Sequence, residues 1–173
     1  MATVNVTSPA VLAPRGEAAI VGSRSAPPQL LRCMVVSLSA ERRRLIRTAA
    51  EAQAWDAIVC RDAGEFLRTA FKRSVPLIVV DLPDSSSRGY GELKGAVERA
   101  KEITSSLLLV IGSGADEAEE VWARQLGAWA YLSEANSLRG FELLLRESRH
   151  AVERRELLAP VPMEFARSAS MLE

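Results

Sequence analysis

The residue best placed for chemistry in this chain is Asp81, which directly follows the apolar run Leu77–Val80. Short, uninterrupted apolar runs of this kind are typical of strands that are buried on both faces of a parallel sheet. Two other runs end in the same way, one at Ser37-Leu38 and one at Gly112-Ser113. Because the carboxyl ends of neighbouring parallel strands border one crevice, we expect these three positions to meet there. Any chemistry of the domain is therefore predicted to take place around Asp81.

The elements that would position Asp81 alternate between strand and helix from residue 30 onward. The predicted strands are 32–38, 57–60, a run introduced by Pro76 and ending at Asp81, 107–111 and 128–132. The predicted helices are about 40–55, one capped by Asp62, one through 93–103, about 116–126, and one from near Ser137 past Arg155. In the fourth helix, the residues expected to face inward are Ala118, Val121, Trp122 and Leu126. Five alternating pairs predict a flavodoxin-like α/β three-layer sandwich, with a five-stranded parallel sheet of order 2-1-3-4-5 and helices on both faces.

The domain is predicted to span residues 30–157 of the 173-residue chain, and to fold without its tails. Residues 1–29 are rich in Ala, Ser, Pro and Gly and show no helical or alternating period, so we expect a disordered N-terminal tail. Residues 158–173 contain Pro160 and Pro162 and are expected to form a flexible C-terminal tail.

Composition excludes several classes of protein. Lys+Arg and Asp+Glu number 22 each, so no net charge draws the chain to nucleic acid or to an anionic membrane. No apolar stretch approaches the roughly 20 residues that cross a bilayer, and the N-terminus lacks the pattern of a signal peptide. We therefore expect a cytoplasmic protein with no membrane or nucleic-acid partner.

The two cysteines, Cys33 and Cys60, both lie inside apolar strand-like runs. This placement favours two buried free thiols in a reducing compartment over a disulfide. They lack the C-x-x-C spacing, and His150 is the only histidine, so no metal site is predicted from them. His150 itself has no acid or base partner nearby in the sequence and is expected to lie at the surface.

Taken together, the order and spacing of these segments resemble the CheY-like receiver domain of bacterial response regulators, over roughly residues 31–155. Two segments carry most of the resemblance. Val35–Arg47 is similar to the receiver's first strand and helix, and Gly127–Glu134 is similar to the Gly-Ala-x-x-Tyr-Leu-x-Lys segment at its fifth strand. In that family the aspartate that ends the third strand accepts a phosphoryl group, and Asp81 stands in its place.

The resemblance also implies roles for the positions around Asp81, and most of them hold residues that cannot fill those roles. The family surrounds its aspartate with an acidic pair after the first strand, a hydroxyl residue, an aromatic switch residue and a lysine after the fifth strand. In this chain the acidic pair corresponds to Ser37 and Leu38, and the hydroxyl residue corresponds to Gly112 with Ser113 beside it. The aromatic position holds Tyr131, and the lysine position holds Glu134. The acidic pair holds the divalent cation that phosphoryl transfer to a carboxylate needs, and leucine is no ligand for it. Glu134 reverses the charge of the lysine and would oppose Asp81. We expect a degenerate receiver without catalytic residues, metal or other cofactor; Mg²⁺ would bind only if Asp81 is still phosphorylated.

Several alternatives remain open at individual positions. Asp81 is either a phosphoacceptor or, as we favour, a structural carboxylate that bonds the backbone amides of residues 83–86. The run Arg42–Arg44 forms either a solvated helix face, the usual case, or a surface for a partner. Gly112-Ser-Gly114 before a helix is a weak phosphate-binding pattern, and the acids that follow from Asp116 would repel an anion.

The function expected from these residues is that of a pseudo-receiver, a two-component signalling module that acts by protein–protein interaction and is not an enzyme. Its partners would be signalling proteins of unidentified kind, and a homodimer through the face of the fourth and fifth helices is left open. One alternative is a single-domain response regulator, a phosphorelay component that is still phosphorylated on Asp81. Another is a flavodoxin-like domain that binds a small ligand.

Overall fold

A computed structural model of the chain describes residues 30–158, with the exception of residues 113, 115, 134 and 136. The predicted N-terminal tail and residues 159–173 of the predicted C-terminal tail lie outside the described residues, while Leu158 is the last residue of a helix. Over the described residues, strands and helices alternate in ten elements: β1 (Leu31–Ser37), α1 (Ala40–Ala52), β2 (Trp55–Cys60), α2 (Ala63–Lys72), β3 (Leu77–Asp81), α3 (Tyr90–Ile103), β4 (Leu107–Gly112), α4 (Glu117–Gln125), β5 (Ala130–Ser133) and α5 (Leu138–Leu158).

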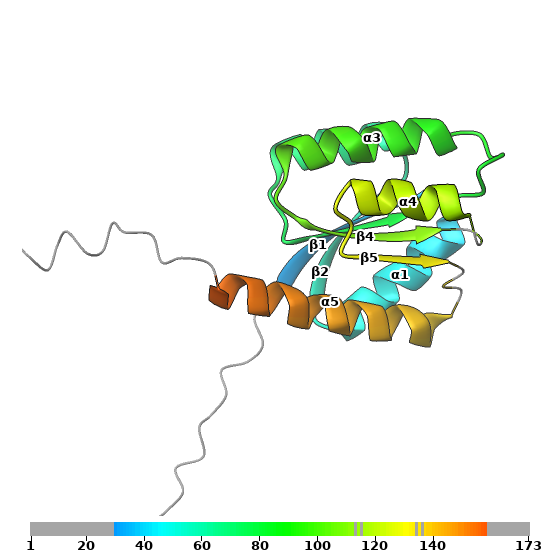
Figure 1. Ribbon diagram of the computed structural model, residues 1–173. Coiled ribbons are helices and arrows are strands. Elements are labelled where there is room, and N and C mark those ends of the chain that lie inside the picture. Colours follow the sequence, from blue (N-terminus) through cyan, green and yellow to red (C-terminus); the bar gives the residue numbers. More distant parts are fainter. Residues whose placement is uncertain (1–29, 113, 115, 134, 136, 159–173) are drawn as a thin grey trace, which may run out of the picture.

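The five strands form one parallel sheet in the order β2-β1-β3-β4-β5, which confirms the predicted topology. Every residue of β3 is buried, as its unbroken apolar run predicts for a central strand. Figure 1 shows α3 and α4 on one side of the sheet and α1 and α5 on the other. The chain thus folds as a flavodoxin-like three-layer sandwich.

Two apolar cores hold the three layers together, one on each face of the sheet. Alternate residues of each strand point to opposite faces, so Met34 and Val36 enter one core while Cys33 and Val35 enter the other. The first core packs α2, α3 and α4 and includes the fully buried side chains of Phe66 and Leu93. The second packs α1 and α5 and contains Phe141.

One predicted boundary is wrong by several residues. We expected the first helix to extend to Trp55, but α1 ends at Ala52 and Trp55 opens β2. Trp55 is buried, and its indole nitrogen donates a hydrogen bond to the Leu145 carbonyl of α5 at 3.0 Å. The indole therefore joins the edge strand to α5, and this tertiary contact overrides the helical period of the sequence.

The inner face of α4 also differs from the prediction. Asp116 is the N-cap, its side chain accepting from the Ala118 and Glu119 amides, so the start of the helix agrees within one residue. Its buried residues are Glu119 and Ala123, while Val121 is 53% exposed. The expectation that Ala118 and Val121 face inward was wrong, because a carboxylate enters the interior here and sets the rotation of the helix.

Candidate functional site

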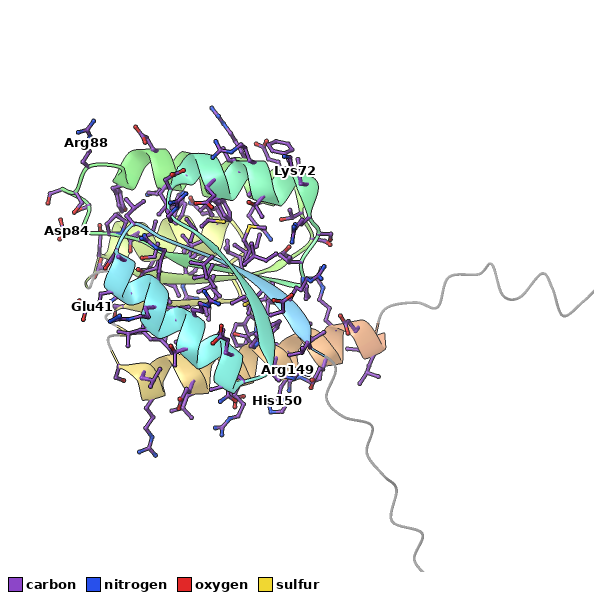
Figure 2. All side chains as sticks on the ribbon, turned by 180° about the vertical axis from the view of Figure 1, so that it is seen from behind. Glu41, Lys72, Asp84, Arg88, Arg149 and His150 are labelled. Atoms are coloured by element: carbon purple, nitrogen blue, oxygen red, sulfur yellow. The ribbon has the colours of Figure 1, made fainter. Side chains whose placement is uncertain are left out.

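The predicted crevice lies at the carboxyl end of the sheet. Ser37 pairs with Asp81 in the register of β1 and β3, and Asp81 pairs with Ile111 in the register of β3 and β4. In Figure 2 the labelled residues Glu41 and Asp84 lie at this end of the domain, and Lys72 lies at the opposite end. A cavity of about 200 Å³ opens here and is lined by Ser37, Leu38, Ser39, Arg42, Asp81, Leu82, Pro83 and Asp84.

Asp81 is bound by the guanidinium of Arg42. Arg42 Nε lies 2.8 Å from both carboxylate oxygens, and Arg42 Nη2 lies 2.5 Å from Oδ1. The Asp81 side chain is only 3% exposed and that of Arg42 is 24% exposed. Ser37 Oγ donates a further hydrogen bond to Asp81 Oδ2 at 2.6 Å. The carboxylate is therefore neutralised from within the chain, and both of its oxygens are engaged.

Arg42 reaches Asp81 because α1 begins directly above the crevice. Ser39 is the N-cap of α1, and its side chain accepts from the Arg42 amide, so Arg42 lies in the first helical turn. The guanidinium also donates to the Ala135 carbonyl at 3.2 Å and lies 5.7 Å from the centre of the Phe141 ring. The side chain thus bridges α1, β3 and the segment between β5 and α5.

The three arginine side chains of the run Arg42–Arg44 differ in their contacts and their exposure. Arg43 Nη1 donates to the Ser37 carbonyl at 2.7 Å, and Arg44 is exposed. A helix turns by about 100° per residue, so three consecutive side chains point in three directions. For Arg42 the expectation of a solvated face was wrong, since its direction is into the crevice.

The loop after β3 is capped by Asp84, which takes the role that we had assigned to Asp81. Asp84 Oδ1 accepts from the Ser86 amide at 2.9 Å and from the Ser86 hydroxyl at 2.6 Å, and these two bonds lower the pKa of Asp84. The partners of Asp81 are instead the side chains of Arg42 and Ser37.

The residues of the crevice do not fit the divalent cation that a receiver would need. Mg²⁺ requires several oxygen ligands in octahedral geometry. Arg42 and Ser37 donate to the Asp81 oxygens, and Leu38 packs against the first apolar core. Within the part of the chain that the structure describes, no group of three or more acidic, histidine or cysteine side chains could hold a metal.

A second polar cluster lies at the end of β4, where the hydroxyl and aromatic positions were predicted. Glu119 of α4 is 3% exposed and accepts from the Tyr90 hydroxyl at 2.8 Å and the Tyr131 hydroxyl at 2.9 Å. We call these three residues the glutamate–tyrosine cluster. Burial, and then the hydrogen bond to Glu119, raise the pKa values of both tyrosine hydroxyls above the usual range. Gly112 borders the cluster, while Ser113 and Glu134 lie outside the described residues.

The remaining predicted residues lie away from the crevice. Cys33 and Cys60 are free and fully buried, as predicted, and they lie on opposite faces of the sheet. The His150 side chain is 57% exposed, and its Nδ1 lies 3.7 Å from Glu153. Over the described residues, no helix combines the length and the apolarity needed to span a membrane.

Three residues of the two polar clusters, Arg42, Tyr90 and Glu119, were not predicted to lie there. Only Arg42 left a usable signal, because a basic residue five positions after Ser37 lies in the helical turn nearest the crevice. Glu119 stands in an acidic run that is typical of a solvated helix start, so nothing in the sequence marks it as buried.

Several solved structures of receiver domains share this fold. A CheY-like receiver domain protein from Methanospirillum hungatei matches with a TM-score of 0.62 at 18% identity, over 74% of this chain and 98% of that one. The signal receiver domain of a putative Luxo repressor from Vibrio parahaemolyticus matches with a TM-score of 0.62 at 12% identity, over 76% and 99%. A response regulator from Thermotoga maritima matches with a TM-score of 0.59 at 18% identity, over 72% and 98%. No protein-family model and no curated protein matches the sequence.

Proposed function

We propose that this chain, which has the receiver-domain fold, is a receiver-like signalling module that acts by protein–protein interaction in the cytoplasm, without phosphotransfer or other enzymatic activity. The observation that carries this proposal is the Arg42–Asp81 ion pair. A carboxylate that attacks a phosphoryl group needs a free oxygen and a cation that offsets the mutual negative charge. The Asp81 oxygens are instead held by the Arg42 guanidinium and the Ser37 hydroxyl.

The neighbouring replacements support the same proposal. Leu38 contributes an apolar contact where a metal ligand would be needed, and Gly112 has no hydroxyl to offer a phosphoryl group. An oxygen-lined cation site could be rebuilt at this end of the sheet only by changing several residues at once. We therefore treat the crevice as a structural element whose charge is already balanced.

The surface of the domain supports a role in protein binding. Val121 of α4, Trp129 just before β5 and Leu143 of α5 each expose an apolar side chain, at 53%, 39% and 46% respectively. Trp is enriched in the centres of protein interfaces. We propose that the partner is a signalling protein, or a second copy of this chain, that contacts the α4 to α5 face.

The test is phosphorylation of the full chain by a small phosphodonor in millimolar Mg²⁺, followed by intact-mass and peptide mass spectrometry. A phosphorylation-competent receiver in the same reaction controls for the donor, and Asp81→Asn controls for the position. We expect no acid-labile adduct on Asp81, and none in Arg42→Ala, because Leu38 still supplies no cation ligand. Near-stoichiometric labelling of the wild type that disappears in Asp81→Asn would overturn the proposal in favour of a working response regulator.

A further inference from the structure

The glutamate–tyrosine cluster joins three elements through one side chain. Glu119 belongs to α4, Tyr90 is the first residue of α3, and Tyr131 lies in β5. A buried carboxylate is costly unless hydrogen bonds compensate for its lost hydration, and here both tyrosine hydroxyls donate to it. The position of α4 is therefore tied to that of α3 and of the sheet.

Gly112 supplies the space in which this cluster forms. A Cβ atom at this position would overlap Glu119 Oε1 and the Tyr131 hydroxyl, and would lie 2.9 Å from Tyr131 Cζ. Tyr131 can thus point its hydroxyl under α4 only because residue 112 has no side chain. The hydroxyl also lies 3.3 Å from the Gly114 carbonyl, on the segment that leads into α4.

A second set of contacts between α3 and α4 surrounds the cluster. Lys94 Nζ lies 5.3 Å from the centre of the Tyr90 ring and 4.4 Å from that of Trp122. The Trp122 indole nitrogen donates to Glu98 at 2.7 Å. These partly exposed contacts fix the outer edge of α4, while Glu119 fixes its buried edge.

We propose that the glutamate–tyrosine cluster is a built-in latch that holds α4 in one position, and that this position is set independently of Asp81. The two polar centres use different partners: Glu119 bonds Tyr90 and Tyr131, whereas Asp81 bonds Arg42 and Ser37. This inference goes beyond the proposed function, because it concerns which conformation the α4 surface adopts and not whether Asp81 reacts.

The test is hydrogen–deuterium exchange of the full chain, read from peptides that cover α4 and β5. Glu119→Ala removes two hydrogen bonds to a charged acceptor and is expected to speed exchange in α4 by at least about tenfold. Glu117→Ala, an exposed acid in the same helical turn, is the matched control and is expected to stay within about threefold of wild type. Asp81→Asn breaks the ion pair with Arg42 and lowers global stability, so α4 exchange is read relative to that of peptides from the central strands β1 and β3; this ratio is expected to stay within about threefold of wild type in Asp81→Asn and to rise in Glu119→Ala.

Two further variants keep the test decisive if Glu119→Ala does not fold. Tyr131→Phe retains the ring and removes one hydrogen bond, and should speed exchange in α4 several-fold. Gly112→Ala inserts a methyl group where the cluster sits and should do the same by displacing Tyr131.

The chain has only two tyrosines, and both are in the cluster, so ultraviolet titration reports on the latch directly. Tyrosine ionisation should begin at lower pH in Glu119→Gln than in wild type. The proposal is overturned if the cluster variants leave the exchange of α4 relative to the central strands unchanged, or if Asp81→Asn raises this ratio as much as they do.

Discussion

Replacing Arg42 by alanine should destabilise the domain markedly. The change removes three donor–acceptor contacts of 2.5 to 2.8 Å and leaves the Ser37 hydroxyl as a remaining donor to Asp81. Breaking a fully buried ion pair by removing one partner costs roughly 3–5 kcal/mol. Because the Arg42 side chain is 24% exposed, water can partly replace it, and we expect about 2–4 kcal/mol.

The assay is chemical denaturation followed by tryptophan fluorescence, with a thermal melt as a second measure. For a domain of this size the expected loss corresponds to a fall in Tm of roughly 5–15 °C. Arg44→Ala, which removes an exposed arginine two residues away on the same helix, is the matched control and should change stability by less than about 0.5 kcal/mol.

A double-mutant cycle separates the ion pair from the other contacts of Arg42. Once Asp81→Asn is present, Arg42→Ala should cost at least about 1.5 kcal/mol less than it does in the wild type, because the buried charge is gone. The reasoning is refuted if Arg42→Ala matches the Arg44→Ala control, or if the two changes at positions 42 and 81 are additive.

Three further predictions concern the cation, the thiols and the tails. Millimolar Mg²⁺ should leave Tm unchanged, whereas a half-saturated native-state site would add about 0.4 kcal/mol; a shift abolished by Asp81→Asn would contradict the loss of the cation site. Burial raises the pKa of Cys33 to about 12 and also raises that of Cys60, so neither thiol should react with a disulfide reagent until the domain unfolds. The unfolded Cys33 thiol ionises first, so its stabilising contribution should be complete below pH 9 and lost between pH 9 and 12, by up to about 1.4 kcal/mol per pH unit, and Cys33→Ala should lack this loss. Limited proteolysis should leave a fragment of about residues 30–157 that keeps the cooperative melt of the whole chain, and unfolding after removal of residues 1–28 would show that the boundary is wrong.

The fold could be predicted from the sequence because its central strands consist of unbroken apolar runs. The runs that end at Ser37, Asp81 and Gly112 fixed three strands, and the alternation with helices then required the order that the structure has. Trp55 escaped the prediction because an aromatic residue fits both the end of an amphipathic helix and the start of a strand. Only its contact with α5 across the fold decides between them.

The candidate site was predictable in location but not in chemistry. The place of Asp81 follows from the sheet topology, whereas its partner lies 39 residues away on a helix whose rotation the sequence does not specify. The same holds for Glu119, the buried acidic residue of α4, for which Gly112 leaves room and to which two tyrosines donate. In both cases the outcome depended on a pairing between elements rather than on the residue type itself.

The two polar centres, one at Asp81 and one at Glu119, explain how the fold is stable although most of the receiver's characteristic site residues are replaced. A crevice with several carboxylates needs a cation to relieve their repulsion, whereas one carboxylate facing one guanidinium is neutral without a ligand. In the same way, a serine or threonine in place of Gly112 would require Tyr131 and Glu119 to move. Glycine leaves the space in which these two side chains meet at the end of β4. Each centre replaces an interaction that would depend on a ligand with one supplied by the chain. Under the proposed function, a domain built in this way presents a fixed α4 surface, and changes in signalling output come from the partner that binds it.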